Sequence, residues 1–202
     1  MRYGGEVVAI GVLAALLVLA GPARSIFTDV AHSNDNEFGS GEFDIAVSKD
    51  GSRFYNDIKL FEFSNLKPGD ERTFTFYIKN RGDVDVSRMT MTLNIKDLEE
   101  SEMSPAEKAV DNTTDVGGEL SKYLVVNELR VHLGDQSWTV DSTKGGRTLS
   151  ELSGVEIGLL NGQQLKAGEV LEVEVTVRFS EKAGNECQTD KTIVDMELNA
   201  EQ

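Results

Sequence analysis

Strict alternation of apolar and polar residues recurs in four segments of this chain. The segments are residues 74–78, 89–95, 171–179 and 194–198. Period-two patterning with one apolar and one polar face is typical of antiparallel strands that pack on one side only. Several strands of this kind in one domain predict an all-β fold, an antiparallel β-sandwich.

Turn signals connect the predicted strands. Residues 129–133 and 136–140 flank Gly134-Asp135, and a two-residue connection with glycine first favours a type II′ hairpin. Segments 66–70 and 165–169 have similar sequences. Each places Pro or Ala before Gly and leads into a long alternating strand. That order suits a type II turn, whose third residue needs a positive φ. We expect two equivalent corners of the sandwich.

Helix is predicted only as short insertions in the middle of the chain. Ser104-Pro105-Ala106-Glu107 combines an N-cap serine, a proline at the first helical position and a glutamate that completes a capping box. Thr148-Leu149-Ser150-Glu151 repeats the capping box, and residues 117–124 add another helical turn. We expect these insertions to cover one edge or end of the sandwich.

The N-terminal segment is predicted to be a secretory signal peptide over residues 1–25. Residues 7–20 are uncharged and almost all Val, Ile, Leu or Ala, which is shorter than the roughly 20 residues of a transmembrane helix. Ala23 and Ser25 then provide small residues at the −3 and −1 positions, so cleavage is expected before Ile26. The alternative is an uncleaved segment that stays attached to the membrane.

The composition of the remaining 177 residues fits one strongly acidic domain. Without Arg2, Arg24 and Glu6 the chain has 18 basic and 34 acidic residues, a net charge of −16. Such a surface repels nucleic acid and anionic lipid, so neither is an expected partner after removal of the signal. The hydrophobic content of 39% over the whole chain and the patterning argue against disorder.

Residues for catalysis are few. His32 and His132 are the only histidines, and neither belongs to the His-Glu-x-x-His helix of zinc hydrolases. Cys187 is the only cysteine, which excludes an intrachain disulfide, and its neighbours lack the basic groups that lower a thiol pKa. We expect Cys187 to be a buried, small apolar side chain; the alternative is an exported thiol that crosslinks subunits. The sequence therefore predicts no catalytic, cofactor or metal site, and a protein that is not an enzyme.

Two polar features stay open as binding or modification sites. Acidic residues between Asp29 and Asp44, and Asp83 and Asp85 after Gly82, offer oxygen ligands for loosely bound calcium. None has EF-hand spacing, so solvated surface charge is the favoured interpretation. Asn112 begins the only glycosylation sequon, Asn112-Thr113-Thr114.

Eight of the nine phenylalanines lie between Phe27 and Phe76, and most are expected to belong to the core. Phe27 and Phe38, however, flank residues 28–37, a segment too polar to bury itself. A chain that begins at Ile26 opens on a strand with no preceding turn. The two aromatic side chains would then anchor this strand in an apolar groove of a sheet to which no hairpin connects it.

Four blocks of the chain together resemble the secreted TasA/camelysin family of fibre-forming proteins, which includes archaeal bundling pilins. Residues 26–29 and 36–45 match an F-x-D then N-x-F-x-x-G-x-L-D start, and residues 65–70 and 80–82 match N-L-x-P-G-D and N-x-G. The third block is the helical insertion. The fourth is residues 183–190 with the terminal Glu-Gln, where Cys187 and Thr189 replace the commoner Tyr and Gly.

This resemblance implies a jelly-roll-like sandwich, residues 39–202, that polymerises with itself by donor-strand complementation. An open sheet edge exposes unpaired backbone groups, and a strand freed by cleavage can fill the edge of the next subunit. The implied donor strand is residues 26–38. Its named contributors are Ile26, Phe27, Thr28, Asp29, Val30 and Phe38.

The implied function is that of a structural subunit of an extracellular, cell-surface fibre or pilus, for biofilm matrix or cell–cell bundling. Head-to-tail contacts of this kind do not close, so they generate a filament. The alternatives are a secreted metalloprotease, a label that the family carries, and a monomeric surface-binding module.

Overall fold

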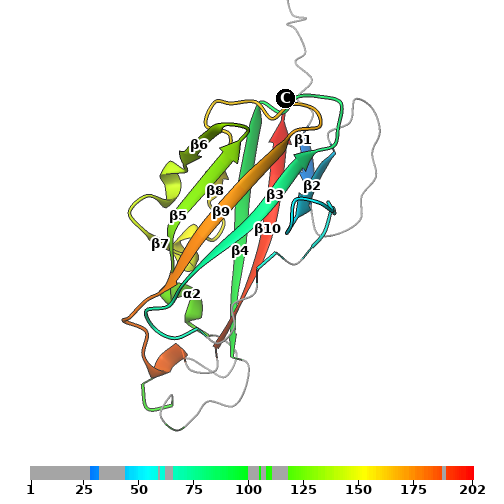
Figure 1. Cartoon of the computed structure of the whole chain (residues 1–202). Coiled ribbons are helices and arrows are strands. Elements are labelled where there is room, and N and C mark those ends of the chain that lie inside the picture. The colour runs from blue at the N-terminus through cyan, green and yellow to red at the C-terminus, as the bar shows by residue number, and fades with distance from the viewer. Residues whose placement is uncertain are drawn as a thin grey trace, which may run out of the picture.

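The computed structural model describes residues 28–31, 44–58, 60–61, 66–99, 105, 108–110, 118–187 and 190–202. The described strands form two antiparallel sheets that pack face to face (Figure 1). The strands are β1 Thr28–Ala31, β2 Ile45–Ser48, β3 Glu71–Asn80, β4 Arg88–Glu99, β5 Leu124–Leu133, β6 Gln136–Thr139, β7 Arg147–Thr148, β8 Glu156–Gly158, β9 Val170–Phe179 and β10 Asp190–Glu201. The helical pieces are α2 Leu120–Tyr123, α3 Leu149–Leu152 and the 3₁₀ turns η1 Asp141–Thr143 and η2 Asn185–Cys187.

The strand order is that of a jelly roll. One sheet runs β1-β10-β4-β8, and the other runs β2-β3-β9-β5-β6, with β7 also pairing with β5. The chain crosses between the sheets repeatedly, for example between β3 and β4 and between β9 and β10, so the long strands β3 and β9, like β4 and β10, pair although they are distant in sequence. This arrangement confirms the predicted all-β sandwich with short helical insertions.

The core lies between the two sheets and is built from alternate strand residues. In β9 the odd-numbered residues from Leu171 to Phe179 are buried, whereas the even-numbered residues face outward. The four alternating segments of the sequence are β3, β4, β9 and β10, as predicted. The largest fully buried side chains come from both sheets and their connections: Phe76, Ile78, Met89, Met91, Leu124, Leu129, Leu152, Ile157, Leu159, Leu165 and Leu171.

The predicted turns are present. Gly134 has φ 56° and Asp135 does not have a positive φ, as a type II′ turn requires. Gly69 and Gly168 have φ 95° and 81°, the left-handed backbone that the third residue of a type II turn needs.

These two type II turns sit at opposite ends of the β3–β9 pair. The amide of Gly69 donates to the carbonyl of Phe179 at 2.8 Å, and the amide of Gly168 donates to that of Asn80 at 2.8 Å. Each turn thus starts one strand of the pair and holds the end of the other strand. The two segments are equivalent corners of the sandwich, as expected from their sequences.

The helical predictions are confirmed where the structure describes them. Thr148 caps α3, its hydroxyl accepts the Glu151 amide, and the Glu151 carboxylate accepts the Thr148 amide, which is a complete capping box. Helix α2 lies within the predicted 117–124. The capping box at 104–107 falls largely outside the described residues.

Strand β2 was not predicted, because all four of its residues are buried and no alternation marks it. The predicted signal peptide and its cleavage site also lie outside the described residues. Among the helices that the structure describes, none has both the length and the apolar character needed to cross a membrane.

Candidate functional site

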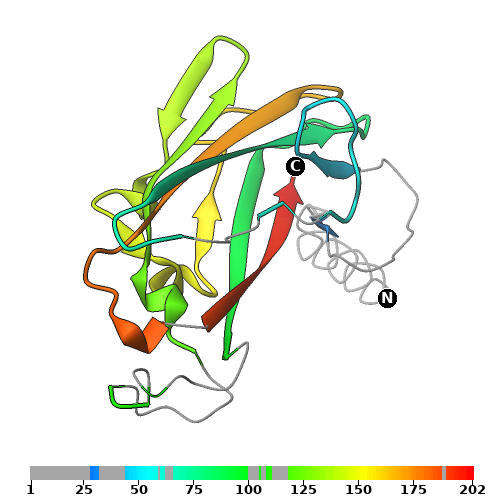
Figure 2. The same ribbon diagram turned by 60° about the horizontal axis from the view of Figure 1, so that its bottom comes forward.

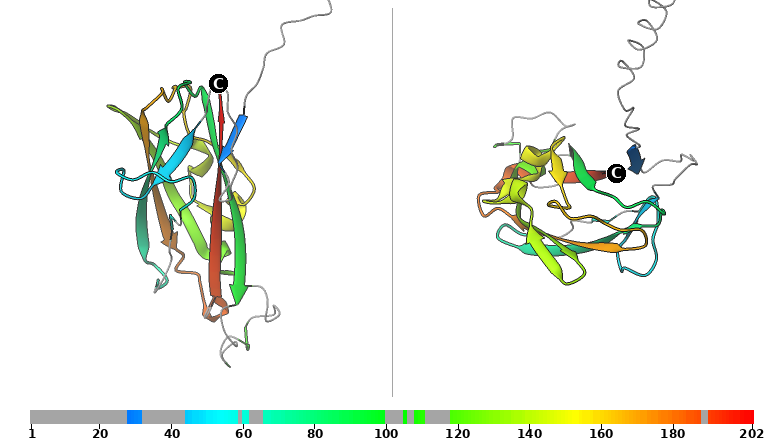
Figure 3. Two further views of the ribbon diagram at one scale, coloured as in Figure 1. Left: turned by 90° about the vertical axis from the view of Figure 1, so that its right-hand side faces the viewer. Right: turned by 90° about the horizontal axis from the view of Figure 1, so that it is seen from above.

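The outer edge of β10 is where the N-terminal strand meets the sandwich. β1 pairs antiparallel with the last positions of β10, from Thr28 opposite Glu201 to Ala31 opposite Leu198. Figure 3 shows β1 beside one end of β10 only. In the described part of the chain, no strand pairs with residues 190–197 on the side of β10 away from β4.

The facing edge of the other sheet is also covered only in part. β2 pairs with β3 at residues 77–80, and no described strand pairs with residues 71–76 on that side of β3. The outer edges of β10 and β3 lie on one side of the sandwich, which we call the open side (Figures 1 and 2). The opposite side, where β6 and β7 flank β5 and where β8 flanks β4, is called the closed side.

Partly buried apolar side chains gather on the open side. Phe61 packs edge-on against Phe74 and Phe76, with ring centroids 5.6 Å apart in both pairs. Val194 and Met196 on β10 are likewise only partly buried against the core. These residues are apolar surface that an added strand can cover further.

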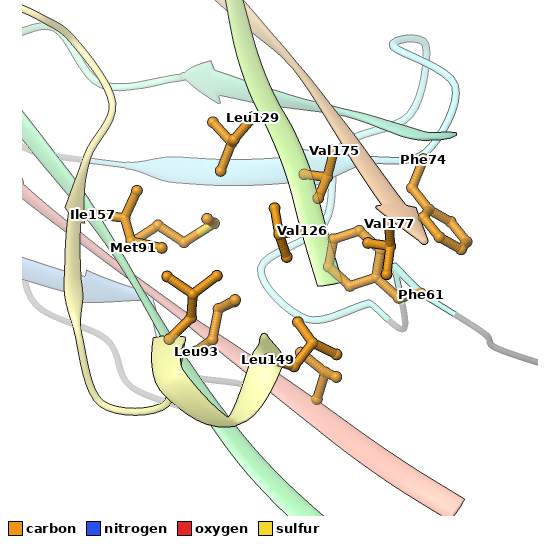
Figure 4. A pocket seen from close by; sticks show the side chains of 12 residues that line it. Phe61, Phe74, Met91, Leu93, Val126, Leu129, Leu149, Ile157, Val175 and Val177 are labelled. Atoms are coloured by element: carbon orange, nitrogen blue, oxygen red, sulfur yellow. The ribbon is translucent and has the colours of Figure 1, made fainter. Parts of the chain in front are cut away.

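An apolar cavity runs between the sheets from this side (Figure 4). Phe61, Phe74 and Val194 line its open-side end, and Leu149 and Ile157 lie toward the closed side. The space open to the centre of a water molecule is only about 20 Å³. Since ligand pockets usually have volumes of roughly 300–1,000 Å³, this cavity is packing space rather than a small-molecule site.

A network of acidic side chains ties α2 to the ends of β4 and β10. Asp97 accepts hydrogen bonds from the Ser121 hydroxyl at 2.5 Å and from the Thr192 hydroxyl at 2.7 Å. Asp190 accepts the amide of Glu119 at 2.5 Å. The two carboxylates therefore hold α2 and its N-cap residue against the sheet that carries the open edge.

Cys187 lies beside this network and packs against the core, but it is only half-buried, less than the sequence predicted. Burial, together with the negative charges of Asp190, Glu186, Glu119 and Asp97, raises the pKa of Cys187 to about 12. Because the thiolate is the nucleophilic form, this setting disfavours a reactive cysteine.

On the outer face of the six-stranded sheet, one histidine meets two glutamates. His132 on β5 lies directly opposite Glu172 on β9, and Glu174 follows two residues along the same face. His132 Nε2 is 3.2 Å from Glu174 Oε2, and one donor atom from each of the three lies within 4.8 Å of the others. Sequence reasoning missed this cluster, because only the strand register brings positions 132 and 172 together.

The predicted site residues are placed as follows. Thr28, Asp29 and Val30 form most of β1. Outside the described residues lie Ala23, Ser25, Ile26, Phe27, Phe38 and Asn112.

The acidic groups considered for calcium are already bonded within the chain at two positions. Asp44 forms an ion pair with Arg81 at 2.7 Å, and Asp85 accepts the amide of Ala167 at 3.0 Å. Calcium binding by the acidic loops remains a prediction.

The chain was compared with known proteins. A family model described as camelysin metallo-endopeptidase matches residues 4–202. A protein described as the major biofilm matrix component of Bacillus subtilis (strain 168) is 36% identical over 92 residues. That match covers 44% of this chain and 32% of the relative, so the chain matches about a third of the relative's length.

The description of the family implies a metal ion. His132, Glu172 and Glu174 offer an imidazole nitrogen and carboxylate oxygens, which is a donor set that zinc accepts. The cluster lies on an outward sheet face, and the apolar cavity between the sheets is lined by other residues. These three residues therefore fit a zinc ion.

Proposed function

This chain belongs to the camelysin family, and from that premise we propose that it is a structural subunit of an extracellular fibre or pilus in a biofilm matrix. Subunits join head to tail by donor-strand complementation, in which the N-terminal strand of one copy completes the sheet of the next. The similarity to a biofilm matrix protein supports this role. An enzymatic activity is not part of the proposal.

The observation that carries the proposal is the partly covered edge of β10. An N-terminal strand pairs there within one chain, from Thr28 to Ala31. The backbone of this edge is therefore compatible with that segment as an antiparallel neighbour. Exchange of the same element between copies, as in domain swapping, makes the same contacts intermolecular and leads to an open chain of subunits.

The length of the predicted donor strand also agrees with the length of β10. In the observed register each step forward along the N-terminal segment is one step back along β10, from Ala31 opposite Leu198. Continued in that register, residues 32–38 meet residues 197–191. The predicted donor strand, residues 26–38, is thus about as long as β10, which spans Asp190–Glu201.

The free energy of association between subunits is expected to depend mainly on backbone hydrogen bonds. Each of the apolar side chains Ile26, Phe27, Val30 and Phe38 that faces the core would contribute on the order of 1.5–3 kcal/mol. Association costs about 4–15 kcal/mol in lost freedom, so the side chains alone do little more than offset that cost. The ladder of hydrogen bonds along β10 then decides whether subunits stay joined.

The register in the fibre is a separate question. The intramolecular register pairs Val30 with Asn199 rather than with the buried Leu198 or Ala200. Because a shift of one residue exchanges the two faces of a strand, the observed register would turn Phe27 toward the core, whereas a shifted register would turn Val30 there instead. We propose that the intermolecular strand keeps the register of β1, so that Phe27 enters the groove.

Negative-stain electron microscopy of the purified exported protein tests the function, and filaments are expected. Disulfide scanning tests the edge and the register. With Cys187→Ala as the background, Val30→Cys is combined in turn with Leu198→Cys, Asn199→Cys and Ala200→Cys. Covalent ladders of subunits are expected for one pair. Filaments in which all three pairs give no link between subunits would reject β10 as the acceptor edge.

Processing before Ile26 is tested by intact-mass analysis of the exported protein. The expected mature chain begins at Ile26, with extracellular localisation and without the apolar segment. A start before Ala23 or after Asp29 would reject this cleavage site.

A secreted metallo-endopeptidase is the second candidate, because the description of the family states it. A zinc ion held by His132, Glu172 and Glu174 would supply an electrophile and an activated water. Proteolysis of an unfolded protein such as casein, measured with and without a chelator, separates this candidate from the first. Chelator-sensitive turnover that His132→Ala abolishes would establish it.

A further inference from the structure

We propose that His132, Glu172 and Glu174 form a binding site for one divalent transition-metal ion of the zinc class. The site does not depend on fibre assembly, since all three residues belong to the two paired strands β5 and β9 of one sheet. It also does not depend on peptidase activity.

The distances suit such an ion. Zinc binds nitrogen and carboxylate oxygen at about 2.0–2.2 Å in tetrahedral geometry, which places its ligand atoms roughly 3.4 Å from one another. His132 Nε2 and Glu174 Oε2 are 3.2 Å apart, and all three donor atoms lie within 4.8 Å. The strands already hold the three residues together, so rotations of their side chains would close the remaining separations.

The local charges favour a cation. Glu172 and Glu174 project from the same face of β9 and repel each other. Arg130 stands opposite Glu174 in the register, but its guanidinium binds Glu128 at 2.8 Å. Among the described residues, no lysine or arginine forms an ion pair with Glu172 or Glu174. A divalent ion would neutralise the two carboxylates.

The donor set selects the type of ion. An imidazole nitrogen suits zinc, copper and nickel, whereas calcium and magnesium prefer oxygen ligands alone. The side chains of His132 and Glu174 are 35% and 36% exposed, so an ion can enter from solvent. Three protein ligands leave a fourth position open on this outer face.

A simpler interpretation is a cross-strand hydrogen bond between His132 and Glu174 that involves no metal. Zinc titration of the purified, chelator-treated protein distinguishes the two interpretations. The protein carries a tag without histidine, and calorimetry measures the stoichiometry and affinity. Co²⁺ added in place of zinc reports tetrahedral coordination through its visible absorption.

We expect one ion for each chain. Loss of residues that merely orient a ligand weakens metal binding about 10–100-fold, so loss of a ligand by His132→Ala should weaken it by at least about tenfold. Glu172→Gln and Glu174→Gln should each weaken it as well. The matched controls, His32→Ala and Asp195→Asn, should bind zinc like the wild type.

Circular dichroism and thermal unfolding confirm that each variant is folded. Absence of saturable zinc binding by the wild type would overturn the proposal. So would a His132→Ala variant that is folded and binds zinc with wild-type affinity, because the hydrogen bond alone would then explain the contact.

Discussion

The two sides of the sandwich are completed by different parts of the chain. On the closed side, the edge of β5 is covered by β6, its own hairpin partner, and by β7 a few residues later. On the open side, the edge of β10 is covered by β1, which lies at the other end of the sequence and pairs with four positions only. One side is completed by neighbours in sequence, and the other depends on a remote strand.

Local contacts reinforce the closed side. The Trp138 indole on β6 donates to the Leu159 carbonyl after β8 at 2.9 Å and so links the two sheets. The capping box of Thr148 and Glu151 fixes α3 beside them. Short connections cost little loop-closure entropy, so these elements form without help from distant residues.

The open side, in contrast, is incompletely covered. Its apolar residues Phe61, Phe74, Val194 and Met196 are partly buried, and both strand edges keep positions that no described strand covers. A side that is completed from a distance can be completed from another copy. Under the proposed function, the closed side maintains the fold and the open side accepts the strand of another subunit.

The largest expected effect is the loss of the donor strand. A chain that starts at Gly39 should be a folded, soluble monomer that forms no fibres, because the edge of β10 then has no strand to accept. Phe27→Asp should do the same by placing a charge in an apolar groove. Electron microscopy with circular dichroism provides the measurement, and normal fibres from either variant would contradict the donor-strand hypothesis.

The next effect concerns Cys187, which precedes β10. Its pKa of about 12 leaves very little thiolate at pH 8, whereas an unfolded chain has an ordinary thiol pKa of about 8.5. Alkylation by iodoacetamide at pH 8 should be about a thousandfold slower in the native protein than in guanidinium. The native rate should rise as the pH approaches about 12. A native rate within tenfold of the unfolded rate would refute this setting.

A core truncation sharpens the comparison in terms of stability. Leu152 is fully buried at the closed side, and Leu152→Ala should lower the free energy of unfolding by about 2–5 kcal/mol. Met196 on the open side is only partly buried, so Met196→Ala should cost less. Urea denaturation of both variants measures the difference, and equal losses would remove the distinction.

The smallest effect is expected at the α3 cap. Thr148→Ala removes the hydroxyl that accepts the Glu151 amide and should destabilise the protein by about 1 kcal/mol. Ser150→Ala, an exposed change within the same helix, is the control, and Thr148→Ser should restore stability. Thermal unfolding is the measurement. A Thr148→Ala variant as stable as the control would show that the cap contributes nothing.

The sequence by itself determined the local features of this protein. Gly69 and Gly168 adopt the positive φ that their turns require, and Gly134 closes the predicted hairpin. The Thr148 capping box formed as expected. These features were readable because each depends on the backbone preferences of a few consecutive residues. The alternation in β3, β4, β9 and β10 likewise gave the fold class.

Only the tertiary structure decided which strands become neighbours. Alternating strands resemble one another, so their pattern alone does not say that β10 lies between β4 and β1. The same register set by global packing brings His132 opposite Glu172 and surrounds Cys187 with carboxylates. Such groupings join residues far apart in the chain, and they arise from the packing of whole sheets rather than from any local preference.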